Sequence, residues 1–345
     1  MKESLPMKKT VYIHVGPHKT GTTTIQHGLA LNEKSLSRQR VLAAKTGRPY
    51  PGNAGNHNLS WELRIPNSRV YKPEYGTWKD LQNEIRENRR VKKIFLTSED
   101  FCLLDEGAIR TIHEYLSDYE VKVIIYLRRQ DDAHQSLWVE FAKNRANLPI
   151  VGSFIEWLEE YNYAIRNYDY LEIVSKWEAV FSPDNIILRV FDPVKFQPSL
   201  FHDFLSLCDI ELNHVITPKH TNISPGVKTI EAIRLLKNHI DFTHLDERKW
   251  NMMAKGLIQF GTEQGWNDNK VNYLSEGLSS KIMGQHEEAN KILAKKYFNR
   301  ENLFDNSAGD QQPATSFTYD DFSREEVIQI FAMTVDLLTS KPEYK

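Results

Sequence analysis

The stretch HVGPHKTGTTTIQ, His14–Gln26, constrains the fold most, because it joins an apolar, strand-like run to a helix-like segment through a glycine-containing turn. Gly16 and Gly21 have the spacing of the two glycines in a Walker A loop, G-x-x-x-x-G-K-[ST]. In such a loop the lysine follows the second glycine, but here Lys19 precedes Gly21 and Thr22 stands in the lysine position. The pattern predicts a phosphate-binding loop whose lysine comes three positions early.

A helix that begins directly after such a turn is suited to bind an anion. The first backbone N–H groups of a helix have no intrahelical partner, and the helix dipole adds partial positive charge there. Gly21 lets the backbone approach a ligand closely, Lys19 adds a full charge, and Thr22, Thr23 and Thr24 add hydroxyl groups. The alternative is a capped strand-to-helix turn with a surface lysine.

Strand-like and helix-like segments alternate along the first part of the chain. Four apolar runs of strand length are rich in β-branched or aromatic residues: Val11–Val15, Lys93–Thr97, Val121–Leu127 and Asn185–Val190. Helices are expected at Thr23–Leu31, Ile109–Tyr119, Asp132–Arg145 and Arg324–Leu338. This alternation predicts an α/β fold with a central parallel sheet flanked by helices. The segment Trp61–Lys79 has weak periodicity and is expected to be a long connection between the first helix and the second strand.

The chain of 345 residues is long enough for a full hydrophobic core. We expect a single domain over residues 1–345, with a nucleotide-binding α/β core at 8–212 and a mostly helical part at 213–345 packed on it. Ser323 and Glu326 have the spacing of a capping box at the start of the last helix.

The overall charge and hydropathy exclude several kinds of partner. A formal net charge of −2 gives no basis for a nucleic-acid partner or a charged membrane surface. No segment approaches the roughly 20 apolar residues of a membrane span. The N-terminal MKESLPMKK has no apolar stretch of signal-peptide length, so we expect a cytoplasmic, bacterial protein.

The motif K-T-G-T-T after the first strand resembles the 5′-phosphosulfate loop, P-K-[ST]-G-T-T, of sulfotransferases that use 3′-phosphoadenosine 5′-phosphosulfate (PAPS). Here His18 is inserted between Pro17 and Lys19. The form H-x-G-x-x-K-T-G-T-T is similar to bacterial, carbohydrate-sulfotransferase-like members of that family. The resemblance implies the P-loop nucleoside-triphosphate-hydrolase-like sulfotransferase fold, PAPS as the sulfuryl donor, and no metal. It also implies that Lys19 lies beside the oxygen that bridges the 5′-phosphate and the sulfuryl group. The expected cofactor-binding residues of the loop are His18, Lys19, Thr20, Gly21, Thr22, Thr23 and Thr24.

A second motif is R-x7-S, formed by Arg128 at the end of the third predicted strand and Ser136 on the following helix. In the sulfotransferases that the chain resembles, an Arg and a Ser at the matching place hold the 3′-phosphate of the cofactor. Arginine suits this role because its charge is permanent and its guanidinium binds phosphate oxygens in a fork. Arg129 could exchange roles with Arg128. The alternative is a strand-end arginine paired with Asp131 or Asp132.

The acceptor hydroxyl must lose a proton as it attacks sulfur, so a general base is expected within hydrogen-bond reach. Glu99, in KIFLTSEDF at the end of the second predicted strand, is the leading candidate, with Ser98 as its neighbour. Bacterial relatives resemble this S-E-D pattern. Glu99 or Asp100 could instead cap a helix. His57, a loop histidine between the first predicted helix and the second predicted strand, could be the base, an acceptor ligand or a turn residue.

A later segment, PKHTNISPG, carries an N-x-S pattern similar to one that bacterial relatives have before a helix. On this resemblance Lys219 and Asn222 are expected to approach the cofactor. The alternative is a helix-capping loop with Pro225 at the first helical position.

These patterns together predict a PAPS-dependent sulfotransferase that transfers the sulfuryl group, in line and without metal, to a hydroxyl or amine of an acceptor. Aromatic and polar residues in Gly52–Lys79 suit stacking on sugar rings, so a carbohydrate acceptor is expected. One alternative is a P-loop kinase or ATPase with a degenerate loop, which would need magnesium and ATP. Another is a non-catalytic nucleotide- or glycan-binding protein on the same fold.

Overall fold

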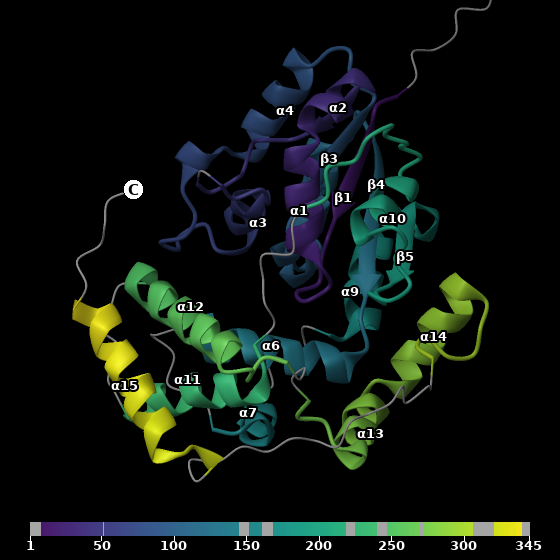
Figure 1. The fold of residues 1–345 in the computed structure, drawn as a ribbon. Coiled ribbons are helices and arrows are strands. Elements are labelled where there is room, and N and C mark those ends of the chain that lie inside the picture. Colours follow the sequence, from purple (N-terminus) through teal and green to yellow (C-terminus); the bar gives the residue numbers. More distant parts are fainter. Residues whose placement is uncertain are drawn as a thin grey trace, which may run out of the picture. The chain divides into compact units, whose positions relative to one another are not determined.

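The computed structural model of the chain describes residues 8–50, 52–144, 152–160, 168–218, 225–239, 247–268, 272–305 and 321–339. The residues group into two compact units (Figure 1). The first unit comprises Met1–Arg129, Arg166–Lys219 and His286–Asn306, and the second comprises Gln130–Ile165, His220–Gln285 and Ser307–Lys345. The single domain of 1–345, divided after residue 212, stays a prediction, and the boundaries of the two units do not coincide with that division.

The first unit is built on a five-stranded sheet with strand order β2-β3-β1-β4-β5. All four strand pairings are parallel, which confirms the predicted α/β class with a central parallel sheet. The strands are β1 (Thr10–His14), β2 (Val41–Ala43), β3 (Lys93–Thr97), β4 (Glu120–Leu127) and β5 (Ile186–Val190). The four predicted strands are present, and β2, with only three residues, was missed.

Both faces of this sheet are covered, as continuous apolar strands require. One face packs against helices α1 (Thr22–Leu31), α2 (Glu33–Arg38) and α10 (Leu200–Ser206) through Tyr12, Phe95, Ile124 and Tyr126. The alternate strand residues, which point to the other face, are also 0% exposed: Val11, Ile13, Leu96, Val123 and Ile125. Burial of both faces explains why these strands read as apolar runs without alternation.

The remaining helices of the first unit correct the prediction of a long connection at Trp61–Lys79. They are α3 (His57–Arg64), α4 (Trp78–Glu87), α5 (Glu106–Tyr115), α9 (Tyr170–Phe181) and α14 (Glu287–Phe298), with short 3₁₀ helices η1 (Pro73–Tyr75), η2 (Glu99–Leu103) and η3 (Pro183–Asn185). The long connection predicted at Trp61–Lys79 is therefore wrong at both ends, since α3 runs to Arg64 and α4 begins at Trp78. The first turn of α3 buries the polar side chains His57, Asn58 and Ser60, so it lacks the apolar periodicity that reveals a helix.

The second unit is helical in the part of the chain that the structure describes. It contains α6 (Gln130–Asn144), α7 (Phe154–Glu160), α11 (Val227–His239), α12 (Glu247–Glu263), α13 (Glu276–Gln285) and α15 (Arg324–Thr339). Trp250, Ile233 and Ile330 belong to its core. The predicted capping box of α15 is confirmed, because the Ser323 N–H donates to Glu326 Oε2 at 2.8 Å and the Glu326 N–H donates to Ser323 Oγ at 3.2 Å.

A search of the described residues for a helix both long and apolar enough to span a bilayer finds none. The cytoplasmic location remains a prediction.

Candidate active site

The predicted phosphate loop connects β1 to α1 at the carboxyl end of the sheet, and its backbone is sharply folded. Gly16, Lys19 and Gly21 have φ angles of 94°, 64° and 77°, in the left-handed region. Lys19 adopts this conformation without being glycine, which costs energy and requires support from the surrounding structure. The Thr20 hydroxyl donates to the Pro17 carbonyl at 2.6 Å and closes the turn from inside.

At the start of α1, no capping side chain among the described residues binds the backbone N–H groups that were predicted to bind an anion. Gly21 is the N-cap residue and has no side chain that could cap the helix, while its carbonyl accepts from the N–H groups of Thr24 and Ile25. The N–H groups of the first helical residues, Thr22 and Thr23, have no carbonyl one turn earlier within the helix. Because the first turn contains no acidic residue, the field of the helix N-terminus is not neutralised there. The backbone of the loop therefore fits a phosphate or sulfate group.

Arg128 lies next to this loop. It follows β4 directly, and its Nη1 donates to the Lys19 carbonyl at 3.0 Å. Its guanidinium carbon lies 5.7 Å from the centroid of the Phe191 ring, and the Tyr170 hydroxyl donates to the Arg128 carbonyl at 2.7 Å. The position of Arg128 is thus fixed from both the backbone and the side chain.

The other predicted contacts to the 3′-phosphate stay predictions. Ser136, the second member of R-x7-S, is half-buried on α6 of the second unit. Lys219 and Asn222 lie outside the described residues.

Glu99 lies against the loop. A Cβ atom added at Gly16 would come within 2.8 Å of the Glu99 Cα, so only glycine allows this approach. β1 and β3 are neighbours in the sheet, and parallel strands end at the same edge. This topology brings Glu99 next to Gly16, in the loop that carries Lys19, although 83 positions separate Gly16 and Glu99 in the sequence.

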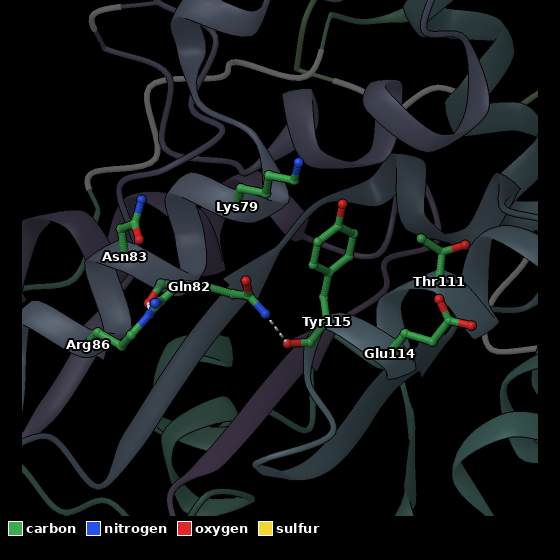
Figure 2. A pocket seen from close by; sticks show the side chains of 7 residues that line it. All are labelled: Lys79, Gln82, Asn83, Arg86, Thr111, Glu114 and Tyr115. Atoms are coloured by element: carbon green, nitrogen blue, oxygen red, sulfur yellow. Dashed lines mark hydrogen bonds between the residues drawn. The ribbon is translucent and has the colours of Figure 1, made fainter.

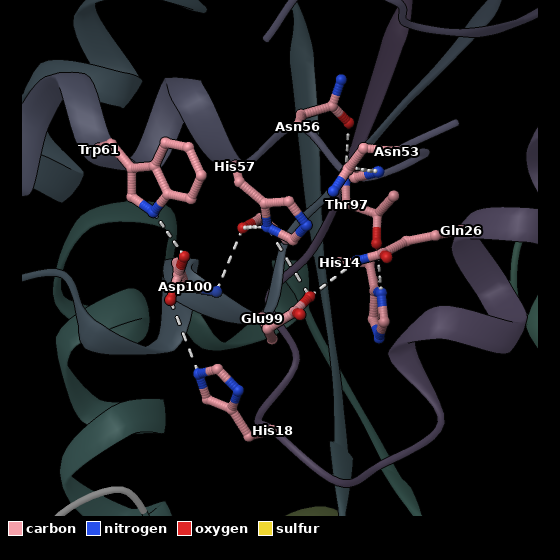
Figure 3. A network of polar contacts seen from close by, with 12 residues as sticks. His14, His18, Gln26, Asn53, Asn56, His57, Trp61, Thr97, Glu99 and Asp100 are labelled. Carbon is pink, nitrogen blue, oxygen red and sulfur yellow. Dashed lines mark hydrogen bonds and ion pairs between the residues drawn. The ribbon is translucent and has the colours of Figure 1, made fainter. Parts of the chain in front are cut away.

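Ser98, Glu99 and Asp100 together contact three parts of the first unit, and Figure 3 shows the contacts of Glu99 and Asp100. Ser98 Oγ lies 2.8 Å from His57 Nδ1. Gln26 Nε2, from α1, donates to Glu99 Oε2 at 2.8 Å. Asp100 is contacted by α3 and by the phosphate loop. The S-E-D pattern therefore links α1, α3 and the loop at one place.

His57 was predicted in a loop but is the first residue of α3. The preceding residue, Asn56, attaches that helix to the end of β3: its N–H donates to the Thr97 carbonyl at 2.7 Å, and the Thr97 N–H donates to Asn56 Oδ1 at 2.9 Å. As a result His57 Nδ1 lies 3.8 Å from Glu99 Oε2. The two candidate bases thus form one pair.

Asp100 has a partner on each carboxylate oxygen. Trp61 Nε1 donates to Oδ2 at 2.7 Å, and His18 Nε2 lies 3.6 Å from Oδ1. Burial raises the pKa of Asp100, but the nearby His18 imidazole, the charge of His57 and the Trp61 hydrogen bond outweigh it and lower the pKa to about 2. Asp100 is therefore ionised at neutral pH.

Sequence reasoning missed Gln26, Trp61 and the pairing role of Asp100. Gln26 stands five positions after Gly21 on α1, where glutamine is an ordinary helix residue. Trp61 follows His57 by four positions, which places both on one face of α3, and their rings stack with centroids 5.8 Å apart. The four-residue spacing could have indicated that His57 and Trp61 lie on one face of a helix, but the segment was interpreted as a loop.

The predicted site residues are absent from an open pocket elsewhere on the first unit, of about 630 Å³ (Figure 2). It lies between α4 and α5 and is lined by Lys79, Gln82, Asn83, Arg86, Thr111, Glu114 and Tyr115.

Within the described ranges, no three His, Cys, Asp or Glu side chains are grouped so that they could hold a metal ion.

Comparisons with known proteins return one relative by sequence and several by structure. No family model matches the chain. A protein from Archaeoglobus fulgidus, described as an uncharacterized protein, is 24% identical over 212 residues, or 61% of this chain. The match covers 55% of that protein, so the chain spans about half the length of the curated relative it matches.

The solved structures that the chain is similar to include sulfotransferases, the family that its motifs resemble. A sulfotransferase from Alicyclobacillus acidocaldarius has a TM-score of 0.39 and 16% identity, over 72% of this chain and 99% of that one. Mouse sulfotransferase SULT7A1, complexed with PAP, has a TM-score of 0.36 and 14% identity, over 85% of each chain. Retinol dehydratase, in a complex with retinol and PAP, has a TM-score of 0.26 and 12% identity, over 99% of this chain and 84% of that one. These values are too low to assign an activity, which must be argued from the residues of the site.

Proposed function

We propose that this protein is a PAPS-dependent sulfotransferase that transfers a sulfuryl group to a hydroxyl or amine of an acceptor. The observation that carries the proposal is the meeting of the lysine-containing loop with the Glu99–His57 pair at one edge of the sheet. An anion-binding loop and a candidate base at the same place are the two parts that sulfuryl transfer needs.

The loop residues bind and stabilise the donor. The N–H groups at the start of α1 and the Lys19 ammonium bind the 5′-phosphosulfate, and PAPS supplies the sulfuryl group and leaves as adenosine 3′,5′-bisphosphate (PAP). By analogy with phosphoryl transfer, positioning and charge stabilisation account for most of the catalysis. Lys19 and the loop amides stabilise the negative charge that develops on the leaving phosphate. Arg128, beside the loop, binds the 3′-phosphate in this proposal. The roles expected for Ser136, Lys219 and Asn222 stay predictions.

Glu99 takes the proton of the acceptor, and His57 stands beside it. The Glu99 side chain is 22% exposed and that of His57 only 8%, so the carboxylate is the more accessible of the two. The His57 Nδ1 atom is already within hydrogen-bond distance of Ser98 Oγ. As the new bond forms between the acceptor oxygen and sulfur, the bond between sulfur and the phosphate oxygen breaks, and the acceptor proton passes to Glu99.

The acceptor is a carbohydrate in this proposal. Support comes from the aromatic residues in 52–79, of which Trp61 is half-buried and lies directly beside His57. An indole ring next to the Glu99–His57 pair offers an apolar surface for a sugar ring while its N–H remains bonded to Asp100.

Calorimetric binding of PAP in EDTA, with magnesium-ATP as competitor, tests the donor site. We expect micromolar, metal-free binding of PAP that magnesium-ATP does not displace. A preference for magnesium-ATP would instead support a kinase or ATPase. PAP binding without transfer of labelled sulfate from PAPS to any member of a glycan array would support a non-catalytic binding protein.

A further inference from the structure

The phosphate loop is connected to α3 by three side chains in series: His18, Asp100 and Trp61 (Figure 3). His18 belongs to the loop, Asp100 to η2 and Trp61 to α3. The two distances in the series are 3.6 Å, from His18 Nε2 to Asp100 Oδ1, and 2.7 Å, from Trp61 Nε1 to Asp100 Oδ2. Residues far apart in the sequence thus form one polar chain that ends beside Lys19.

The orientation of the Asp100 carboxylate is fixed at both ends. Its backbone N–H donates to Ser98 Oγ at 3.1 Å, and the indole N–H of Trp61 holds Oδ2. The remaining oxygen, Oδ1, is the one that faces His18. A carboxylate held in this way orients an imidazole and favours its protonated form.

We propose that Asp100 and Trp61 are positioning residues that hold His18 as an imidazolium and thereby fix the donor-binding conformation of the phosphate loop. This inference rests on the proposed function, since it concerns the same loop. His18 immediately precedes Lys19, whose left-handed backbone conformation must be maintained by its surroundings. The Asp100–His18 contact supplies such support on the side of η2, and Arg128 supplies it at the Lys19 carbonyl.

Other ionisable groups lie around this contact. Asp100 is influenced by the charges of His18 and His57, and Glu99 lies next to both Asp100 and His57. Cys102, also on η2, is buried, and burial together with Asp100 and Glu99 raises its pKa, so it stays a neutral thiol. Lys19 adjoins His18 in the loop, and Arg64 on α3 reaches the same surroundings.

The test follows the imidazole of His18 by NMR in the full chain, without any ligand. His18→Gln identifies the His18 resonances. Asp100→Asn removes the charge but keeps the shape, and we expect it to lower the midpoint of the His18 titration by about one pH unit. Trp61→Phe keeps the charge but removes the N–H that orients it, and should lower the midpoint by a smaller amount. Asp118→Asn, an exposed carboxylate in the turn before β4, is the matched control and should leave the midpoint unchanged.

Binding of PAP to the same variants connects the contact to the loop. At pH 7.5, Asp100→Asn should weaken PAP binding by about threefold or more, and the pH dependence of its binding should move to lower pH by the same amount as the NMR midpoint. An unchanged His18 midpoint in Asp100→Asn would overturn the inference while leaving the proposed function intact. If the wild-type protein bound no PAP at any pH, the proposed function itself would fail, and the NMR result would then describe only a structural ion pair.

Discussion

Gln26 Nε2 donates a hydrogen bond to Glu99 Oε2 at 2.8 Å, and this contact joins the helix that follows the phosphate loop to the candidate base. Gln26 lies one helical turn beyond the N-terminus of α1, so in the proposed function one helix binds the donor through its backbone N–H groups and the base through a side chain. The side chain of Gln26 is only 5% exposed, so few other conformations are open to it. In the proposed function, α1 therefore sets much of the position of the donor relative to the base.

Gln26→Leu should lower kcat for sulfuryl transfer about tenfold and leave PAP binding nearly unchanged. The loss of one hydrogen bond to a charged group is worth roughly 1.5–3 kcal/mol, of which part is recovered by water. The measurement is transfer of labelled sulfate from PAPS to the acceptor found on a glycan array, together with PAP calorimetry. Gln82→Leu is the control. The Gln82 amide donates to the Tyr115 carbonyl in the pocket of Figure 2, away from the candidate site, so this variant should behave as wild type. A Gln26 variant that lost PAP binding but kept kcat would contradict this role.

Lys19→Ala should reduce transfer by at least about a hundredfold, because the leaving phosphate loses its principal cation. The fold should persist, since the loop backbone is also held by Thr20 and Arg128. Circular dichroism and the urea midpoint check the fold, and labelled sulfate transfer checks activity. Lys34→Ala on α2 removes a lysine elsewhere and should be neutral. Full activity of Lys19→Ala would remove the basis of the sulfotransferase assignment.

The sequence predicted the parts of the site that depend on local patterns. Lys19 and Gly21 were identified from the motif of the loop and Glu99 from its position at a strand end, and the structure brings the loop and Glu99 to one edge of the sheet. Gln26, Trp61 and Asp100 were not assigned these contacts, because each acts through a partner distant in the sequence. β2 escaped prediction because three residues are too few to show a period.

The error over α3 has a different physical origin. This helix begins with buried polar residues. The side-chain amide of Asn56 donates to the Ala44 carbonyl, and that of Asn58 donates to the Lys72 carbonyl. These polar side chains can be buried because they are hydrogen-bonded. Their burial therefore leaves no periodic pattern of apolar residues in the sequence. His57 was therefore recognised as a candidate but assigned to a loop.

Gly21→Ala should destabilise the first unit by about 1–2 kcal/mol and weaken PAP binding. A φ of 77° is unfavourable for alanine, and the added Cβ would collide with the side chain of Leu200. Gly107→Ala, in the first turn of α5, has ordinary surroundings and no positive φ, so it should be neutral or slightly stabilising. Urea unfolding of both variants measures the difference. Equal stability of the two variants would show that the loop tolerates a side chain at Gly21.

His14 should make the protein lose stability as the pH falls from about 6.5. It is fully buried in β1, with Nδ1 2.8 Å from Thr97 Oγ1, and burial lowers its pKa to about 3. Between the ordinary histidine pKa of about 6.5 and the folded-state pKa of about 3, the unfolded chain binds a proton at His14 that the folded protein does not. The free energy of unfolding therefore has its full value, as far as His14 is concerned, above pH 6.5 and falls as the pH is lowered toward about 3. The slope from this one group approaches about 1.4 kcal/mol per pH unit.

His14→Gln, which does not titrate, tests this origin of the pH dependence by urea unfolding between pH 7 and pH 4.5. His286 has a pKa lowered by burial as well and contributes with the same sign, so the variant should retain part of the slope. Asp100 affects stability only at lower pH. Its pKa is lowered from 3.8 to about 2, so its contribution to the free energy of unfolding is lost as the pH falls between these two values. His27→Gln, on the exposed side of α1, should keep the full wild-type slope. An unchanged slope in His14→Gln would mean that the buried imidazole accepts a proton without cost, contrary to its burial.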